Sequence, residues 1–348
     1  MRDVVPVLPA VATDTAATRL GRRSRALFAL RDWLREADFV EADTPQLVPG
    51  PGLEPHIDPL GIDVALDLHG QQRQRRYLIT SPELGLKRVV AAGVPRVFQL
   101  GHVFRDGERS ARHTPEFTLL EWYRGPGTLN DILDDTMALI RTVASAIGNA
   151  SAIDVAAPPE RLTIADAFAR HAGIDLGAAI DETAAGDDGA LARRARAAGL
   201  DLIGTTVGFD DAFFAVMDTR VEPAIGRHRL CVLEQWPATM AVLARLDDDD
   251  PRYARRFELY GHGATGCLEL CNAFDELTDA VEQRRRFGID NAIRQSLGKA
   301  VLPLDEDFLQ ALPLLPKPSA GNALGVDRLL MLLTGAASID DVQALPFR

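Results

Sequence analysis

The sequence of 348 residues predicts a mixed α+β fold, and two strand pairs and three helices carry that prediction. Residues 96–105 and 117–124 read as strands on either side of a polar loop, as in a β-hairpin. Residues 255–274 read as a second strand pair around a Gly-rich turn. Helices are predicted where apolar residues recur at helical spacing, over residues 19–38, 129–148 and 279–299.

The N-terminal region begins with small and polar residues and prolines, so we expect a flexible lead-in over residues 1–17. In the helix that follows, Leu27, Leu30 and Leu34 recur at the spacing that places side chains on one helical face. This helix gives way near residue 38 to a short predicted strand over residues 39–45, which a proline ends.

A Pro/Gly-rich loop over residues 47–62 comes before a strand and a helix in residues 76–93. The turn between them lies at Ser81-Pro82, and Glu83 opens the helix. A proline and an acidic residue are both favoured in the first turn of a helix, so the boundary is well defined.

The hairpin strand over residues 117–124 has two distinct faces. Because alternate side chains of a strand share a face, Glu121 and Tyr123 should lie on the same side as Phe117 and Leu119. The side chains between them should point to the opposite side.

The middle of the chain, residues 151–236, is rich in alanine and predicts a mostly helical connecting subregion. In the C-terminal part, residues 321–342 read as a glycine-started and otherwise apolar helix that carries Asp327 and Arg328. The sequence shows no internal repeat, heptad array or low-complexity tail.

The composition narrows the functional classes. A net charge of −12 makes this chain a poor candidate for non-specific nucleic-acid binding, which depends on clustered Lys and Arg. No apolar run is long enough to span a bilayer, and the N-terminus lacks a signal-peptide pattern. The three cysteines are an odd and sparse set, which fits a reducing compartment. We therefore expect a cytoplasmic protein without a membrane partner.

Two arginines are candidates for anion binding. Arg328 lies in a helix that is apolar on nearly every face, so it should be buried and should need a partner. That partner could be structural, such as Asp327 or a distant Glu, or it could be a ligand. Arg105 ends a strand just before a polar loop, where a guanidinium can bind a phosphate or a carboxylate in a bidentate manner.

Two sets of acidic residues are candidates for binding cations. Glu258 and Glu269 lie on opposite strands of the Gly-rich hairpin and would suit a magnesium–phosphate complex, unless they are solvent-facing acids at a sheet edge. Glu121, Tyr123 and Glu276 would fix an ammonium group, although Tyr123 could also be a core residue. The sequence contains no P-loop and no dinucleotide-binding Gly motif, so a nucleotide would bind on the sheet.

Five segments in order carry a family resemblance, namely FVEADTP, VFRDGERSARHTPEFTLLEWY, RFELY, LELCNAFDELTDA and ALGVDRLLML. They resemble the motifs of class II lysyl-tRNA synthetases, and more closely those of the short paralogues that attach lysine or β-lysine to elongation factor P. The similarity runs from about residue 20 to the C-terminus. It implies a class II aminoacyl-tRNA synthetase catalytic domain over residues 18–348, with an antiparallel sheet flanked by helices. It also implies ATP and Mg²⁺ as cofactors and a homodimer formed through residues 39–45.

The resemblance assigns roles to residues that match the motifs. Arg105 would hold the α-phosphate and the amino-acid carboxylate, His113 would face the phosphate tail, and Phe117 and Arg328 would sandwich the adenine; Arg105 and Arg328 would be catalytic. Glu258 and Glu269 would hold magnesium. The implied ATP contacts are Arg105, Asp106, Glu108, His113, Thr114, Phe117, Glu269, Leu270, Gly325 and Arg328. The implied amino-acid contacts are Ser81, Pro82, Glu83, Glu121, Tyr123, Asn272 and Glu276.

Three positions depart from the family pattern. Gly107 stands where the family usually has Glu, which displaces Glu108 by one residue, Thr114 stands where it has Asn, and Ala273 stands where it has Gly. These differences bear on nucleotide contacts and leave the phosphate and ammonium anchors in place.

Three functions remain open from the sequence. The first is a ligase that forms lysyl- or (R)-β-lysyl-adenylate from ATP and transfers the acyl group to a lysine of elongation factor P. The second is a stand-alone lysine-specific tRNA aminoacylating enzyme, and the third is a non-catalytic synthetase paralogue. The acidic charge, the short segment before the motifs and Ala323, where the tRNA synthetases tend to have Gly, favour the first function and no stable tRNA binding.

Overall fold

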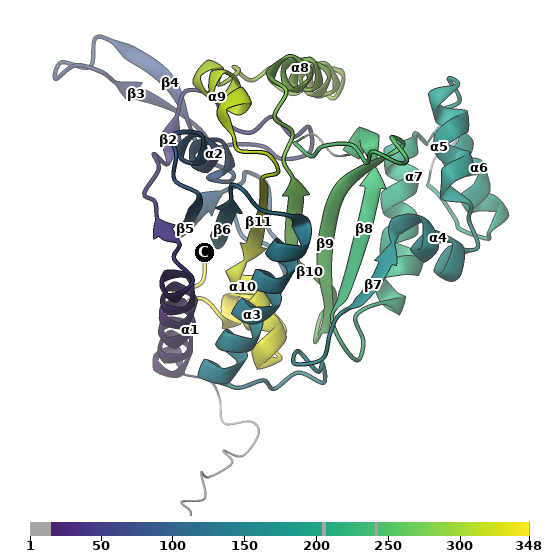
Figure 1. Ribbon diagram of the computed structural model, residues 1–348, viewed down its shortest axis with the longest axis horizontal. Coiled ribbons are helices and arrows are strands. Elements are labelled where there is room, and N and C mark those ends of the chain that lie inside the picture. The colour runs from purple at the N-terminus through teal and green to yellow at the C-terminus, as the bar shows by residue number, and fades with distance from the viewer. Residues whose placement is uncertain (1–14, 204–206, 241–242, 348) are drawn as a thin grey trace, which may run out of the picture.

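A central sheet of eight strands organises the computed structural model, which describes residues 15–203, 207–240 and 243–347 (Figure 1). In spatial order the strands are β1 (Val40–Glu41), β5 (Arg96–Phe104), β6 (Glu116–Arg124), β11 (Ala320–Gly325), β10 (Gly266–Asp275), β9 (Tyr253–Gly263), β8 (Cys231–Pro237) and β7 (Glu160–Thr163). Only the two edge pairs, β1–β5 and β8–β7, are parallel among these strands. The predicted α+β fold with an antiparallel sheet is confirmed.

Helices cover both faces of this sheet. On one face α1 (Ala16–Glu36), α3 (Leu129–Ile147) and α10 (Val326–Thr334) pack against Leu120 and Trp122 of β6 (Figure 1). On the opposite face α2 (Glu83–Ala91), α8 (Ala280–Ser296) and α9 (Glu306–Ala311) pack around Tyr123. As the alternation predicted, successive side chains of β6 point to opposite faces of the sheet, with Leu120 and Trp122 in one apolar core and Tyr123 in another.

Several helices, α1 and α3 among them, begin at residues whose side chains satisfy free backbone N–H groups. The Thr15 side chain accepts from the N–H of Thr18 at the start of α1. The lead-in expected over residues 1–17 lies mostly outside the described residues, and the helix begins at Ala16. At α3, Thr128 and Asp131 form a reciprocal capping box.

The N-terminal part of the chain also forms a second, three-stranded sheet, with the order β2 (Leu47–Val48), β4 (Arg73–Leu78) and β3 (Gly61–Ala65). β3 and β4 form a hairpin that projects from the body of the molecule (Figure 1). The predicted loop over residues 47–62 is wrong at both ends, which form β2 and the start of β3; β2 has only two residues, and the largely exposed side chains of β3 give no apolar alternation. β4 leads directly into the Ser81-Pro82 turn, and α2 begins at Glu83 as predicted.

The connecting subregion contains α4 (Ile164–Ala172), α5 (Leu176–Ala184), α6 (Ala190–Ala197) and α7 (Phe209–Val216). Its apolar core includes Phe168 and Phe213, whose ring centroids are 5.0 Å apart. The flanks of residues 151–236 differ from the mostly helical expectation, because β7 and β8 belong to the central sheet. Short helical turns complete the fold at Met217–Val221, Glu222–Ala224, Ala238–Met240, Leu312–Leu314 and Ile339–Asp341.

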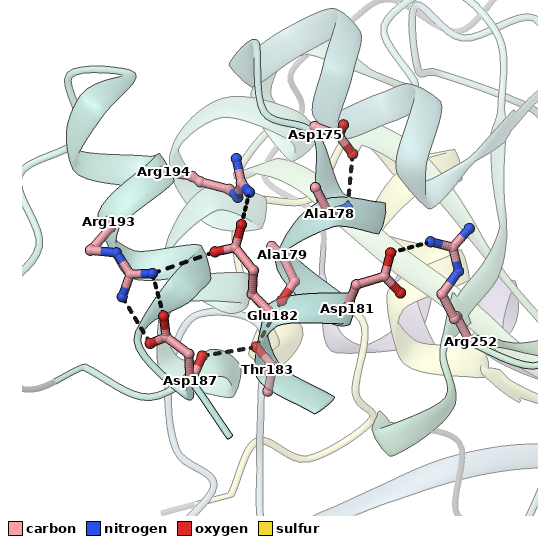
Figure 2. Close-up of polar contacts among 10 residues, drawn as sticks. All are labelled: Asp175, Ala178, Ala179, Asp181, Glu182, Thr183, Asp187, Arg193, Arg194 and Arg252. Atoms are coloured by element: carbon pink, nitrogen blue, oxygen red, sulfur yellow. Dashed lines mark hydrogen bonds and ion pairs between the residues drawn. The ribbon is translucent and has the colours of Figure 1, made fainter. Parts of the chain in front are cut away.

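Ion pairs on the surface connect the helices of this subregion (Figure 2). Glu182 on α5 pairs with Arg193 and Arg194 on α6. Asp181 on the same helix pairs with Arg252, just before β9, at 2.9 Å. Because most of these groups are well exposed, solvent screens the pairs and they contribute little to stability, and the buried phenylalanines dominate the packing.

The C-terminal segment corrects one prediction. Residues 320–325 form β11 between β6 and β10, and the helix α10 begins only at Val326 with Gly325 as its N-cap. A Cβ atom added to Gly321 would overlap the ring of Tyr123, its partner on β6. The segment has little intrinsic strand preference, so pairing on both sides determines its conformation.

Candidate active site

A row of side chains on one face of the central sheet crosses five neighbouring strands, and the candidate site lies on this row. Gln99, Glu121, Ala323, Asn272 and Glu258 are consecutive cross-strand partners. Partners in register direct their side chains to the same face of a sheet, so residues from distant parts of the chain meet here. The row connects the predicted ammonium ligands at one end with the predicted metal ligands at the other.

Glu121 is held in a buried hydrogen-bond arrangement. The Tyr123 hydroxyl donates to one of its carboxylate oxygens at 2.6 Å, and the Ser81 hydroxyl donates to the other at 2.6 Å. Burial, and then the nearby charge of Glu83, raise the pKa of Glu121 to about 8. An incoming ammonium group would favour the carboxylate form, which is the chemistry predicted for this site.

Lys87 places a protein amine beside the same group of acids. Its Nζ lies 2.5 Å from Glu83 Oε1 and also forms an ion pair with Glu276. Burial acts against the charged lysine, but Glu276 and Glu83 raise the pKa of Lys87 above its ordinary value. Burial raises the pKa of Glu276 to about 8. Pro82, the N-cap of α2, fixes the start of the helix that carries Glu83 and Lys87.

Arg105 is linked to this amine site through the neighbouring residues Thr80 and Ser81, which contact Arg105 and Glu121 respectively. Its guanidinium carbon is 5.0 Å from the centroid of the Phe117 ring, and its Nε donates to the Thr80 carbonyl at 3.4 Å. Glu108 Oε1 lies 3.8 Å from Arg105 Nη1. The intervening Gly107 has φ = 76°, a left-handed conformation that favours glycine, which gives a physical reason for the departure from the family pattern there.

Arg328 links the end of the sheet to the loop after β5. Its Nη1 donates to the Glu269 carbonyl at 3.0 Å and to Glu269 Oε2 at 3.2 Å. Its Nη2 lies 2.6 Å from His113 Nε2, and His113 Nδ1 lies 2.8 Å from the Ser110 hydroxyl. Burial and the charge of Arg328 lower the pKa of His113 to about 4, so a neutral imidazole accepts from Arg328 and donates to Ser110.

The expectation that Arg328 is buried is wrong. Its side chain is 23% exposed, and the buried charge of this helix is Asp327 at 2%. Asp327 pairs with Arg23 of α1 at 2.6 Å and accepts from the N–H of Thr118 at 2.7 Å. Arg328 lies in the first turn of α10, where a long side chain can extend from an apolar helix to the sheet end.

Glu258 and Glu269 share a face because of a β-bulge. The register of β9 and β10 shifts at Leu270, so Glu269 lies on the same side as Glu258 in spite of the alternation along β10. Burial, and then Glu269, raise the pKa of Glu258 to about 7. Arg256 and Tyr260 donate to the two oxygens of Glu258. Across the residues that the structure describes, no cluster of three or more metal-ligating side chains is present.

Other predicted contacts have different surroundings. Asp106 is exposed, and its N–H donates to the Asp58 carbonyl at 2.7 Å. Thr114 is 1% exposed, and its hydroxyl has no hydrogen-bond partner among the described residues. The Asn272 side chain accepts from Arg256 Nε at 3.0 Å.

Sequence reasoning missed several residues of the site. Lys87 follows Glu83 by four positions in a helix, a spacing typical of a surface ion pair. Arg256 and Tyr260 lie two residues on either side of Glu258, so strand alternation could have placed them on its face. Burial raises the pKa of Glu222 to about 7, with contributions from Asp218 and Glu269, although it belongs to the connecting subregion.

The chain matches the family model described as tRNA synthetases class II (D, K and N) over residues 8–348. The chain therefore belongs to the class II tRNA synthetase family, which confirms the resemblance of its motifs and implies the use of ATP. It is 35% identical over 339 residues to the elongation factor P–(R)-beta-lysine ligase of Pseudoalteromonas translucida, which covers 96% of both chains. It is 35% identical over 321 residues to the ligase of the same name from Histophilus somni, and 36% identical over 326 residues to that of Salmonella paratyphi B, covering 92% and 93% of each chain.

The helices of the described residues include none that is both long and apolar enough to cross a membrane.

Proposed function

We propose that this protein activates (R)-β-lysine, or lysine, with ATP and transfers the acyl group to a lysine side chain of elongation factor P. The relatives that align along nearly the whole chain are named for this reaction. The observation that carries the proposal is the arrangement of Glu121, Glu276 and Tyr123 on one side of Arg105. This arrangement suits a substrate with an amine at one end and an anionic reacting group at the other.

In the first step, a carboxylate oxygen of the amino acid attacks the α-phosphorus of ATP, and pyrophosphate leaves. Arg105 would bind the substrate carboxylate and the α-phosphate, while Arg328 would stabilise charge on the departing phosphates. His113, which accepts from Arg328, would orient that guanidinium. Glu121 and Glu276 would hold the terminal ammonium group, so that the carboxylate lies at the phosphate.

In the second step, a neutral lysine amine of elongation factor P attacks the carbonyl of the adenylate. The new amide bond forms as the mixed anhydride breaks, AMP leaves, and the amine releases one proton. The proposed residues position charges and exclude water, and no side chain needs to form a covalent bond with the substrate.

Magnesium is part of the proposal. Glu258 and Glu269 are two carboxylates on one face of the sheet, a donor set that suits Mg²⁺ when substrate phosphates supply further oxygens. The ion would neutralise charge on the phosphates. Arg256 and Tyr260 hold Glu258, and Arg328 holds Glu269, so both carboxylates are already oriented by hydrogen bonds.

We further propose that the protein is a cytoplasmic homodimer. Large apolar side chains are exposed on the first helix and the edge strand, with Leu20 at 53%, Phe28 at 64% and Val40 at 55%. Covering such side chains is a common reason for association. A cytoplasmic location is where an enzyme would meet a translation factor as its acceptor.

The acceptor is tested by supplying ATP and radiolabelled (R)-β-lysine or lysine with elongation factor P and with bulk tRNA in parallel. Label in the protein band, with little in tRNA, supports the ligase. Alkali-labile label in tRNA, with none in the factor, would show a tRNA aminoacylating enzyme instead. No activation of either amino acid would point to a non-catalytic paralogue.

A further inference from the structure

Glu54 carries a buried carboxylate that the proposed reaction does not yet use. Its Oε2 atom is inaccessible to solvent and has no hydrogen-bond partner among the described residues. Burial, and then the charge of Glu83, raise the pKa of Glu54 above its ordinary value. A buried carboxylate oxygen without a donor costs stability, so the position is informative when it lies beside a binding site.

The surroundings of Glu54 place it beside Thr80, in the segment Thr80-Ser81 that contacts both Arg105 and Glu121. A Cβ atom added to Gly52 would lie 2.6 Å from Glu54 Oε2 and 3.2 Å from the Thr80 hydroxyl oxygen, so both groups line the same small space. The Thr80 carbonyl accepts from Arg105. The charges that act on Glu54 are those of Glu83, Arg105 and Lys87, which are residues of the site itself.

The backbone around Glu54 is held from several sides. Arg294 of α8 donates to the Glu54 carbonyl at 3.2 Å and to the Ile57 carbonyl at 2.9 Å. Asp58 is bridged to Asp106, at the end of β5, by a backbone hydrogen bond of 2.7 Å. Leu53 is 1% exposed in the core that contains Tyr123. A carboxylate with one oxygen, Oε2, free within the described residues is therefore presented by an anchored segment, as expected of a binding group.

The balance of charge indicates what the carboxylate would bind. Glu83 and Glu276 share the ammonium group of Lys87, whereas the hydrogen bonds that Glu121 accepts within the described residues come from the neutral hydroxyl groups of Ser81 and Tyr123. Glu54 and Glu121 are thus two carboxylates for which the described part of the chain shows no ion pair, and the nearby Arg105 is assigned to the substrate carboxylate and phosphate. A substrate with two ammonium groups would satisfy both.

We propose that Glu54 binds the second amine of the substrate, the one nearer its carboxylate, and so selects diamino acids over acids with a terminal amine alone. This inference rests on the proposed function and adds a specificity-determining residue to it. The amine of β-lysine nearer the carboxylate would lie between Glu54 and Glu83, while the terminal amine would lie at Glu121 and Glu276.

The alternative is a purely structural role. Asp290 of α8 also has a buried oxygen without a partner among the described residues, and the charge of Glu54 contributes, after burial, to raising the pKa of Asp290. If Glu54 served only to share a proton with Asp290, its replacement would affect all amino acids alike. The two roles therefore predict different dependence on the substrate.

The test uses full-length Glu54→Gln and two substrates that differ by one amine, (R)-β-lysine and 6-aminohexanoic acid. Dissociation constants are measured by titration calorimetry, and KM by ATP–pyrophosphate exchange. We expect Glu54→Gln to raise the dissociation constant of (R)-β-lysine by about tenfold to hundredfold, the effect of losing one charge-assisted hydrogen bond. The dissociation constant of 6-aminohexanoic acid should change by less than about twofold. An equal loss of affinity for both acids, or an unchanged affinity for β-lysine, would overturn the proposal.

Control variants separate the possible failures. Glu182→Gln makes the same chemical change in a surface ion pair of α5 and should leave both affinities unchanged. Glu276→Gln should lower the affinity for 6-aminohexanoic acid, because it alters the end of the amino-acid site that is proposed to bind the terminal amine. If Glu54→Gln does not fold by circular dichroism, Glu54→Asp carries the same comparison, since it keeps the charge and shortens the reach. Failure of the wild-type protein to modify elongation factor P would overturn the proposed acceptor and leave this comparison of affinities intact.

Discussion

Lys87 and Glu276 form an ion pair in which both side chains are buried, at 1% and 0% exposure. The pair lies in the pocket where the substrate amine is proposed to bind, and Glu83 completes it at 2.5 Å from Lys87 Nζ. The pocket thus contains a permanent ammonium group that partly neutralises its carboxylates. The charge left over determines how many substrate amines the pocket can accept.

The first prediction concerns the removal of this internal cation. Lys87→Met keeps the length of the side chain but leaves Glu83 and Glu276 buried without their partner. Breaking a buried pair in this way should lower the free energy of unfolding by about 3–5 kcal/mol. Urea unfolding at pH 8 measures the loss. Lys317→Met, at an exposed position, should change stability by less than about 0.5 kcal/mol, and an equal loss in both variants would contradict the role of the pair.

The second prediction concerns pH. The pKa of Glu121 rises from 4.5 to about 8 on folding, so the folded protein binds a proton here that the unfolded chain releases. The stabilising effect is complete below about pH 4.5 and is lost as the pH rises through 8, by an amount on the order of a few kcal/mol. Glu121→Gln should therefore lose less stability than the wild type between pH 5 and 8. Parallel stability curves for the two proteins would show that Glu121 does not titrate as described.

The sequence was sufficient for much of the fold because its signals are local. The hairpin of β5 and β6 follows from alternation, the start of α2 at Glu83 from residues favoured in a first helical turn, and α3 from apolar residues at helical spacing. The family motifs then identified the candidate site residues. Both kinds of signal depend on residue types at fixed spacings, which a sequence displays directly.

The remaining features depend on contacts between distant residues. The bulge at Leu270 changes which side chains share a face of the sheet. Residues 268–271 contain no glycine or turn-forming residue from which the bulge could be predicted. β11 is a strand because two neighbours pair with it, and Asp327 is buried because Arg23 of the first helix reaches it. From the sequence Lys87 has the spacing of a surface residue, and its burial depends on the segment just after β10, where Glu276 pairs with it.

The third prediction concerns Arg328. Arg328→Ala removes the donor proposed to stabilise the leaving pyrophosphate, so ATP–pyrophosphate exchange should fall by about 10²- to 10³-fold. The same change should raise the pKa of His113 from about 4 towards its ordinary value, because the charge of Arg328 contributes to the depression after burial. Exchange kinetics and imidazole titration by NMR measure the two effects.

The control for this experiment is Arg161→Ala. Arg161 of the edge strand β7 pairs with Glu234 on the surface at 2.6 Å, and its loss should leave exchange unchanged. If Arg328→Ala retained normal exchange with its fold intact, Arg328 would not act on the phosphates. An unchanged pKa of His113 would contradict the contact between the two side chains.

The fourth prediction tests the close approach of β11 to β6. A Cβ atom at position 321 would overlap the Tyr123 ring, and the ring hydroxyl holds Glu121 at 2.6 Å. Gly321→Ala should therefore lower the free energy of unfolding by about 1–3 kcal/mol, as overpacking of a core does, and should raise KM for the amino acid more than KM for ATP. Gly288→Ala is the matched control, because a Cβ there meets nothing within 4 Å and the residue lies within α8. It should stabilise the protein by about 0.5–1 kcal/mol through helix propensity and leave both KM values unchanged. Chemical denaturation and pyrophosphate exchange distinguish these outcomes, and a Gly321→Ala protein with wild-type stability and KM would show that Tyr123 can move aside without disturbing Glu121.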